Sequence, residues 1–318
     1  MEHDELPSGL EADIQLLRLS VGWAPRDFYL TEQARSAGFP SADYFGLYAV
    51  EGDRILSMVR VLRLPYTFPD GHAETISGVL SVITRQDSRG RGLARRLLDE
   101  VNARERRAGS RFSLLWSESI TAHRLYESMG YEDVYTPDIA AKRPPHRGTA
   151  DVPYELAAVK DEDVPAIERL HDAATLERIG FTPRPRGLLG SLMTFGLFKP
   201  DSFRLILRNG RPLGYLELQE APGSVNVSEV VMTGDPSDTA GLLSVLERAS
   251  AGRWLSFWNT FVRDSKKALE GRGYSFSNLG DSLLMSVPLD KVKSETRRQT
   301  SVLGTADQRF VCQSLDHF

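Results

Sequence analysis

Residues 82–94 read VITRQDSRGRGLA, and this stretch decides the fold of the chain. The β-branched run at its start predicts a strand. After its two glycines, apolar residues recur with helical spacing from Ala94 to Val101. A strand that turns through glycines into a helix leaves backbone amides uncovered at the helix N-terminus, where the helix dipole favours an anion. Because Arg89 and Arg91 add positive charge, the stretch predicts a pyrophosphate site.

Two nucleotide motifs can be excluded at this site. A P-loop ends in Gly-Lys-Ser or Gly-Lys-Thr, and neither sequence occurs here. A dinucleotide-binding fingerprint needs a small residue three positions after Gly92, where Arg95 stands. Coenzyme A is the remaining common ligand with a pyrophosphate, so we expect a coenzyme A site.

Strands and helices alternate around this stretch. Before it we expect a short helix at 12–21, a hairpin of strands at 43–51 and 54–64, and a strand at 75–84. After it we expect a helix ending at Gly109, a strand at 112–116, a helix at 122–129 and one strand at 134–141. Residues 142–152 are proline-rich and charged, which indicates a linker.

The second half of the chain runs through the same order of elements. We expect a helix at 161–174, a hairpin around Asn209-Gly210, a strand at 225–233, a helix at 240–249, a strand at 254–258, a helix at 265–270 and a strand at 283–287. We interpret this repetition as the internal duplication of one α+β unit. The expected domains are residues 1–145 and 152–290, followed by a polar tail at 291–318.

The composition excludes several classes of protein. With 26% charged residues and a formal net charge of −4, the chain lacks the basic excess of a nucleic-acid binder. Cys312 is the single cysteine, which excludes an internal disulfide and cysteine-rich zinc sites. No stretch approaches the roughly 18 apolar residues of a membrane span, and the start does not resemble a signal peptide. We therefore expect a cytoplasmic protein with neither nucleic acid nor membrane as a partner and with no metal site.

A second motif follows the glycine stretch, and together the two resemble the GNAT (Gcn5-related N-acetyltransferase) superfamily. Its signature, Gln/Arg-x-x-Gly-x-Gly/Ala, is matched by Arg89, Gly92 and Ala94. Family members also carry Asn-x-x-Ala-x-x-Leu-Tyr followed by Gly-Phe or Gly-Tyr, and here the matching residues are Ser119, Ala122, Leu125, Tyr126 and Gly130-Tyr131. Two positions depart from the family pattern: Ser119 stands in place of the asparagine, and Gln86 stands where proline is common.

The resemblance implies an α+β fold of two tandem GNAT-like units, each a mixed, mostly antiparallel sheet flanked by helices. It implies transfer of an acetyl group from acetyl-CoA to an amine acceptor, either a small molecule or a lysine or peptide amine. The residues that it places at the cofactor are Val82, Ile83, Thr84, Arg89, Gly90, Arg91, Gly92, Leu93, Ala94, Ser119 and Ala122. Tyr126 would protonate the departing thiolate, although its place on the apolar face of a helix also fits a core tyrosine. Glu74 and Glu118 are candidates for the general base.

The second unit departs from the family where the chemistry lies. Gly234-Asp235-Pro236-Ser237-Asp238 replaces the glycine stretch, with two aspartates that would repel a phosphate, and Leu269 replaces Tyr126. We expect this unit to bind no coenzyme A. An active first copy followed by a degenerate second copy is similar to the enhanced-intracellular-survival (Eis) type of acetyltransferase, here without its third domain. That similarity adds the terminal carboxylate of Phe318 as a further candidate base and makes an oligomer possible. A non-catalytic acyl-CoA sensor and an interaction scaffold stay open as alternatives.

Overall fold

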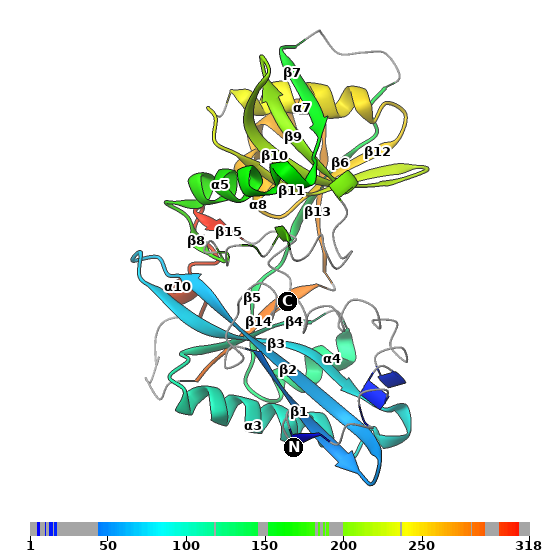
Figure 1. Cartoon of the computed structure of the whole chain (residues 1–318), viewed down its shortest axis with the longest axis vertical. Helices are drawn as coiled ribbons and strands as arrows, with labels where there is room; N and C mark the ends of the chain where they lie inside the picture. The colour runs from blue at the N-terminus through cyan, green and yellow to red at the C-terminus, as the bar shows by residue number, and fades with distance from the viewer. Residues whose placement is uncertain are drawn as a thin grey trace.

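The computed structural model describes residues 44–117, 119–145, 152–181, 200–235, 237–280, 282–289 and 299–311, with isolated positions before residue 18 and between 184 and 190. Two mixed sheets form its frame, one above the other in Figure 1, and helices flank each of them. Most strand pairs are antiparallel. This confirms the predicted α+β class with two similar mixed sheets. In the part of the chain that the structure describes, no helix is both long and apolar enough to cross a membrane.

The first sheet has eight strands within the described residues. Its order is β15-β8-β2-β3-β4-β14-β5, and β1 also pairs with β2. The bounds are β1 Tyr44–Glu51, β2 Arg54–Thr67, β3 Ala73–Thr84, β4 Phe112–Ser117, β5 Glu132–Tyr135, β8 Ile179–Gly180, β14 Leu283–Pro288 and β15 Phe310–Val311. The predicted hairpin of β1 and β2 is confirmed, with Gly52 at its turn in the left-handed region (φ 60°).

The second sheet has seven strands in the order β13-β6-β12-β11-β10-β9-β7. The bounds are β6 Asp138–Lys142, β7 Tyr154–Ala158, β9 Phe203–Arg208, β10 Arg211–Ala221, β11 Ser224–Met232, β12 Trp254–Trp258 and β13 Ser275–Asn278. The predicted hairpin of β9 and β10 is also confirmed. Asn209 (φ 51°) and Gly210 (φ 73°) both have the positive φ that a two-residue hairpin turn requires.

The two sheets exchange a strand. The prediction of one strand at 134–141 is wrong, because the strand is interrupted at Pro137, which has no backbone N–H for a sheet ladder. After Pro137 the chain continues as a strand of the other sheet. There β6 lies between β12 and β13, while β14 crosses back to lie between β4 and β5 (Figure 1). The expected domain division at residues 145 and 152 remains a prediction, and it does not separate the two sheets.

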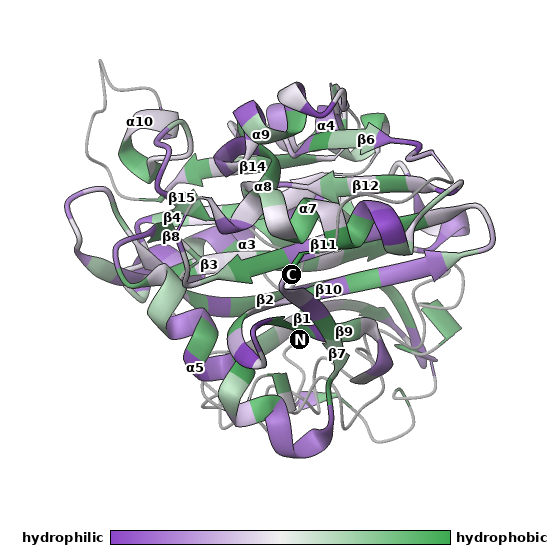
Figure 2. Ribbon diagram, turned by 90° about the horizontal axis from the view of Figure 1, so that it is seen from above, coloured by the Kyte–Doolittle hydropathy of each residue, from purple (hydrophilic) through white to green (hydrophobic). Residues whose placement is uncertain are grey.

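The described helices are α3 Leu93–Arg107, α4 Ile120–Glu127, α5 Val164–Thr175, α7 Asp238–Ala249, α8 Thr260–Asp264, α9 Lys266–Gly271 and α10 Gln299–Leu303. Each long helix buries one apolar face against a sheet. Leu98 and Val101 of α3 join the core of the first sheet, and Leu242 and Leu246 of α7 join that of the second. Figure 2 shows the same division, with central strands such as β3 and β11 largely hydrophobic and helices of mixed colour.

The segment after residue 298, which we expected only as a polar tail, returns to the first sheet. Leu303 and Phe310 are fully buried in a core beneath β2 and β5. The Tyr66 hydroxyl donates a hydrogen bond to the Leu303 carbonyl (2.7 Å), and the Thr305 hydroxyl donates one to the Val134 carbonyl (2.6 Å). Residues 299–311 therefore help to complete the first core.

Candidate active site

Strands β3 and β4 separate from one another toward their C-terminal ends. They pair in parallel only over Ser77–Val79 and Ser113–Leu115. Beyond these pairs β3 continues through Leu80–Thr84 and β4 through Trp116–Ser117, and we call these two ends the fork. A bulge marks the start of the fork on β3, where Ser81 has a positive φ of 52°. The fork therefore presents strand backbone that is not used in pairing β3 to β4.

The glycine loop follows the fork directly. After β3 the chain makes a 3-10 turn, η4 at Gln86–Ser88, and then passes through Gly90 (φ 77°) and Gly92 (φ 70°). Gly92 is the N-cap of α3, a helix of 15 residues. A Cβ added at either glycine would meet nothing within 4 Å, so these residues are needed for their backbone conformation and face open space. No side chain caps the first amides of α3, and they are left for an anion.

Two arginines stand beside the loop, and each makes only a weak contact within the protein. Arg91 pairs with Glu51 (3.0 Å), but both side chains are about half exposed or more, so solvent screens this pair. The Arg89 Nε donates to the Thr84 carbonyl at 3.4 Å. Both guanidinium groups can therefore turn to a bound phosphate at small cost.

The other residues expected at the cofactor have side chains that are buried, half-buried or bonded within the protein. Ile83 points away from the fork into a core that includes Ile14 and Met58. The Thr84 hydroxyl shares a hydrogen bond with Ser57 (2.8 Å). Leu93 is buried at the start of α3, while Ala94 and Val82 are half-buried.

Tyr126 and Tyr131 lie side by side in the core between α3, α4 and the sheet, with ring centroids 6.0 Å apart. The Tyr131 hydroxyl shares a hydrogen bond with Ser113 (2.8 Å) and donates to Asn102 (3.2 Å). Among the described residues, the Tyr126 hydroxyl has no hydrogen-bond partner, although the residue is only 5% exposed. The hydroxyl of Tyr131 is thus used by the fold, whereas that of Tyr126 is available to a ligand.

Burial sets the acidity of both tyrosines. It raises the pKa of Tyr131 to about 12, although the hydrogen bonds that the hydroxyl makes with Ser113 and Asn102 act in the opposite direction. Burial also raises the pKa of Tyr126, and the neighbouring Tyr131 adds to the shift. A thiol has an ordinary pKa of about 8.5, so this shift widens the gap between Tyr126 and a thiol. Tyr126 is therefore better suited to donate a hydrogen bond to sulfur than to give up its proton.

The remaining expected residues divide into three groups. Ser119 is the exposed N-cap of α4, and Ala122 is half-buried in the core beside Tyr126. Glu118 and Phe318 lie outside the described residues. Glu74 is the second residue of β3 and pairs with Arg111 (3.3 Å) and His72 (3.1 Å). Because it stands ten residues before Thr84, it is roughly 30 Å along the strand from the glycine loop, which is too far for a base at the fork.

The second unit repeats the backbone of this site without its chemistry. The amide of Tyr131 donates to the Tyr126 carbonyl, and the amide of Tyr274 donates to the Leu269 carbonyl, both at 3.1 Å. These matching bonds place Leu269 at the position of Tyr126. Leu269 is fully buried and has no hydroxyl to offer.

The N-terminus of α7 carries an internal anion. Asp238 is only 1% exposed. Its carboxylate accepts hydrogen bonds from the Asp235 amide (3.0 Å) and the Tyr154 hydroxyl, and it forms an ion pair with Arg208 (2.9 Å). A Cβ at Gly234 would collide with this carboxylate. The second unit thus fills with its own side chain the place that stays open at α3.

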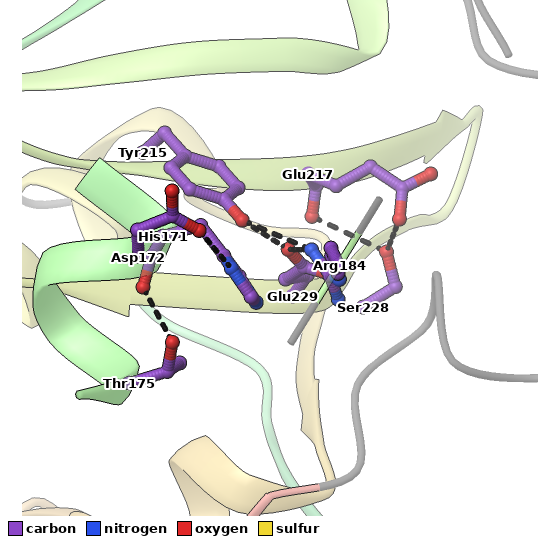
Figure 3. Close-up of polar contacts among 8 residues, drawn as sticks. All are labelled: His171, Asp172, Thr175, Arg184, Tyr215, Glu217, Ser228 and Glu229. Carbon is purple, nitrogen blue, oxygen red and sulfur yellow. Dashed lines mark hydrogen bonds and ion pairs between the residues drawn. The ribbon is translucent and has the colours of Figure 1, made fainter. Parts of the chain in front are cut away.

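A buried polar cluster lies between α5 and strands β10 and β11 of the second unit (Figure 3). Arg184 holds Glu229 through two bonds (2.9 and 3.1 Å), and the Tyr215 hydroxyl donates to the same carboxylate (2.5 Å). Ser228 hydrogen-bonds Glu217, which stands opposite Glu229 across the two strands. The sequence analysis did not identify this cluster, because Arg184 is 45 residues from Glu229. Its carboxylates are engaged within the protein, so we assign them a structural role.

Comparisons with known proteins find a family model that matches part of the chain and solved structures with a similar fold. Residues 8–134 match the family model described as the acetyltransferase (GNAT) domain. A probable N-acyltransferase from Enterococcus faecalis V583 has 14% identity and a TM-score of 0.64, and the match covers 89% of this chain and 71% of that one. A GCN5-related N-acetyltransferase from Anabaena variabilis has 13% identity and a TM-score of 0.65, with coverages of 91% and 73%. Eis1 from Mycobacterium abscessus has 14% identity and a TM-score of 0.55, with coverages of 84% and 71%.

No curated protein matches the chain in sequence. At these identities the solved structures establish the fold alone. The resemblance to GNAT proteins that the two sequence motifs carried is confirmed by the family model and by the shared fold.

Proposed function

We propose that this protein transfers an acetyl group from acetyl-CoA to an amine. The premise is that its residues 8–134 match the GNAT acetyltransferase domain. The observation that supports this most directly is the open N-terminus of α3. Gly90 and Gly92 place uncapped amides there beside two arginines that are free to turn. This arrangement fits the pyrophosphate of coenzyme A in charge and in hydrogen-bond type.

The bound donor supplies a thioester, and the residues of the chain position it. The amides of α3 would hold the phosphates, and the fork backbone would orient the pantetheine arm and polarise the thioester carbonyl. In the reaction a C–N bond forms to the acyl carbon while the C–S bond breaks, and the amine loses a proton. Tyr126 would donate a hydrogen bond to the departing sulfur. Glu118 remains the proposed acceptor of the amine proton.

A thiol-release assay on the full chain tests this function. Purified protein is mixed with acetyl-CoA and, separately, with an aminoglycoside, a polyamine and a lysine-containing peptide, and free thiol is followed over time. One thiol per chain comes from Cys312 and is subtracted. We expect release that depends on at least one amine.

The other outcomes separate the alternatives. Coenzyme A binding by calorimetry without amine-dependent release would favour an acyl-CoA sensor and overturn the proposed reaction. Absence of both binding and release would favour an interaction scaffold.

A further inference from the structure

A helical segment near the N-terminus packs beneath the strand that leads into the glycine loop. Leu10, Ile14 and Leu17 are buried, and they share a core with residues of β1, β2 and β3. One member of that core is Ile83, which lies one residue before the end of the pairing that β3 makes with β2. The segment thus contacts the side of the fork opposite to α4.

Asp13 of this segment makes two polar contacts in the same place. One carboxylate oxygen accepts a hydrogen bond from the Ile55 amide at 2.6 Å. The other forms an ion pair with Arg85, and these two side chains are only 16% and 18% exposed. Arg85 in turn donates from Nε to the Ile55 carbonyl at 2.6 Å. The pair therefore satisfies both backbone groups of one residue at the β1–β2 hairpin and fixes Arg85 against it.

Arg85 is the residue at which β3 becomes the glycine loop. Its amide donates to the Leu56 carbonyl (2.9 Å), and its own carbonyl accepts from the Ser88 amide (3.0 Å), which closes η4. The loop continues from there through Arg89 to Gly92. A displacement of Arg85 would move the amides at the start of α3 relative to the fork.

We propose that Asp13 and Arg85 form a positioning pair for the donor site, so that the N-terminal segment helps to set the affinity of the chain for coenzyme A. This inference rests on the proposed function. Asp13 holds in place a partly buried guanidinium that forms an ion pair with no other carboxylate among the described residues, although the charge of Asp87 also acts on it. Without that charge, the Arg85 side chain turns toward solvent, and the turn it anchors loses its fixed position.

Calorimetry with coenzyme A itself, on the full chain, tests the pair. The variants are Asp13→Asn, Arg85→Gln and the double variant. We expect each single variant to raise the dissociation constant about tenfold, and the double variant to raise it no further, because residues that act as one unit are not additive. Glu100→Gln is the matched control, since it also removes one carboxylate from an arginine pair, that with Arg107 on α3, but both partners are more than half exposed (60% and 68%). We expect its dissociation constant to stay within about twofold of that of the wild type.

Each outcome decides the question. If the wild type and Asp13→Asn bind coenzyme A equally well, the proposed positioning role of the pair is overturned, even if the variant melts at a lower temperature. Additive losses in the double variant overturn it as well. A wild type that does not bind coenzyme A refutes the proposed function instead. If Asp13→Asn fails to fold, Arg85→Lys, which keeps the charge but loses the Nε contact to Ile55, must still weaken binding by more than the Glu100→Gln control.

Discussion

The N-termini of α3 and α7 occupy equivalent places in the two sheets, and they treat a negative charge in opposite ways. At α3 two glycines with positive φ leave the first amides open. At α7 the carboxylate of Asp238 lies in the corresponding place, bonded to an amide, an arginine and a tyrosine. The same attraction of a helix N-terminus for an anion would thus serve ligand binding in the unit that we propose to be active, whereas in the other unit an acidic side chain of the chain itself lies at the helix start.

We expect the largest effect from a substitution that closes the glycine loop at α3. Replacing Gly92 with valine forces a β-branched residue into φ 70°, a conformation that costs about 1–3 kcal/mol, and it displaces the amides that follow. We expect coenzyme A binding to fall below detection by calorimetry. Gly109→Val at the other end of the helix, where φ is 90° and the space is also open, is the matched control and should bind normally. Equal affinity for Gly92→Val and the wild type would remove the loop from the donor site.

The two neighbouring tyrosines give the next largest effect. Tyr126→Phe should lower turnover by about 10²-fold, because a positioned donor to the sulfur is lost, and should leave the melting temperature almost unchanged. Tyr131→Phe should do the reverse, losing about 1–3 kcal/mol of stability because its partners Ser113 and Asn102 lose their hydrogen bonds, while turnover is retained. Measuring melting temperature and turnover for both variants is sufficient. A Tyr126→Phe enzyme that is destabilised but fully active would make Tyr126 a core residue only.

The second unit should respond to Asp238→Ala in stability alone. Removing the carboxylate leaves the Asp235 amide, the Tyr154 hydroxyl and Arg208 without their acceptor, so we expect a loss of about 1–3 kcal/mol in urea unfolding. The stoichiometry of coenzyme A should stay at one per chain. Two sites in the wild type, or a lost first site in this variant, would contradict the division between the units.

The smallest expected effect is that of pH on the reaction rate, which should stay constant at high pH. Tyr126 must be protonated to donate a hydrogen bond, and its raised pKa keeps it protonated above the ordinary tyrosine value of about 10. The rate at saturating donor and amine should therefore not decline up to about pH 10. A decline at lower pH in the wild type, absent from Tyr126→Phe, would mean that Tyr126 ionises in the working range.

Local sequence signals gave the hairpins, the glycine loop and the helix after it, because turn glycines and apolar spacing act over a few residues. The exchange of β6 and β14 was not predictable in this way, since Pro137 signals a break but not the sheet in which the chain continues. The prediction that the second loop binds no coenzyme A stays a prediction. We based it on repulsion by aspartates, and the structure adds that the Asp238 carboxylate accepts a hydrogen bond from the Asp235 amide. The contact of Asp13 with Arg85 joins residues 72 positions apart, beyond the reach of any local pattern.

The crossing of β6 and β14 also imposes an order of events on the ribosome. The strands β4 and β5 cannot gain their shared neighbour until Pro288 has been synthesised and has emerged. Until then the nascent first sheet has two unsatisfied strand edges, which are sites for aggregation and for chaperones. Recombination between related genes at the linker would leave each product with mismatched strands in both sheets. The two halves are therefore expected to be inherited and to diverge as a single unit.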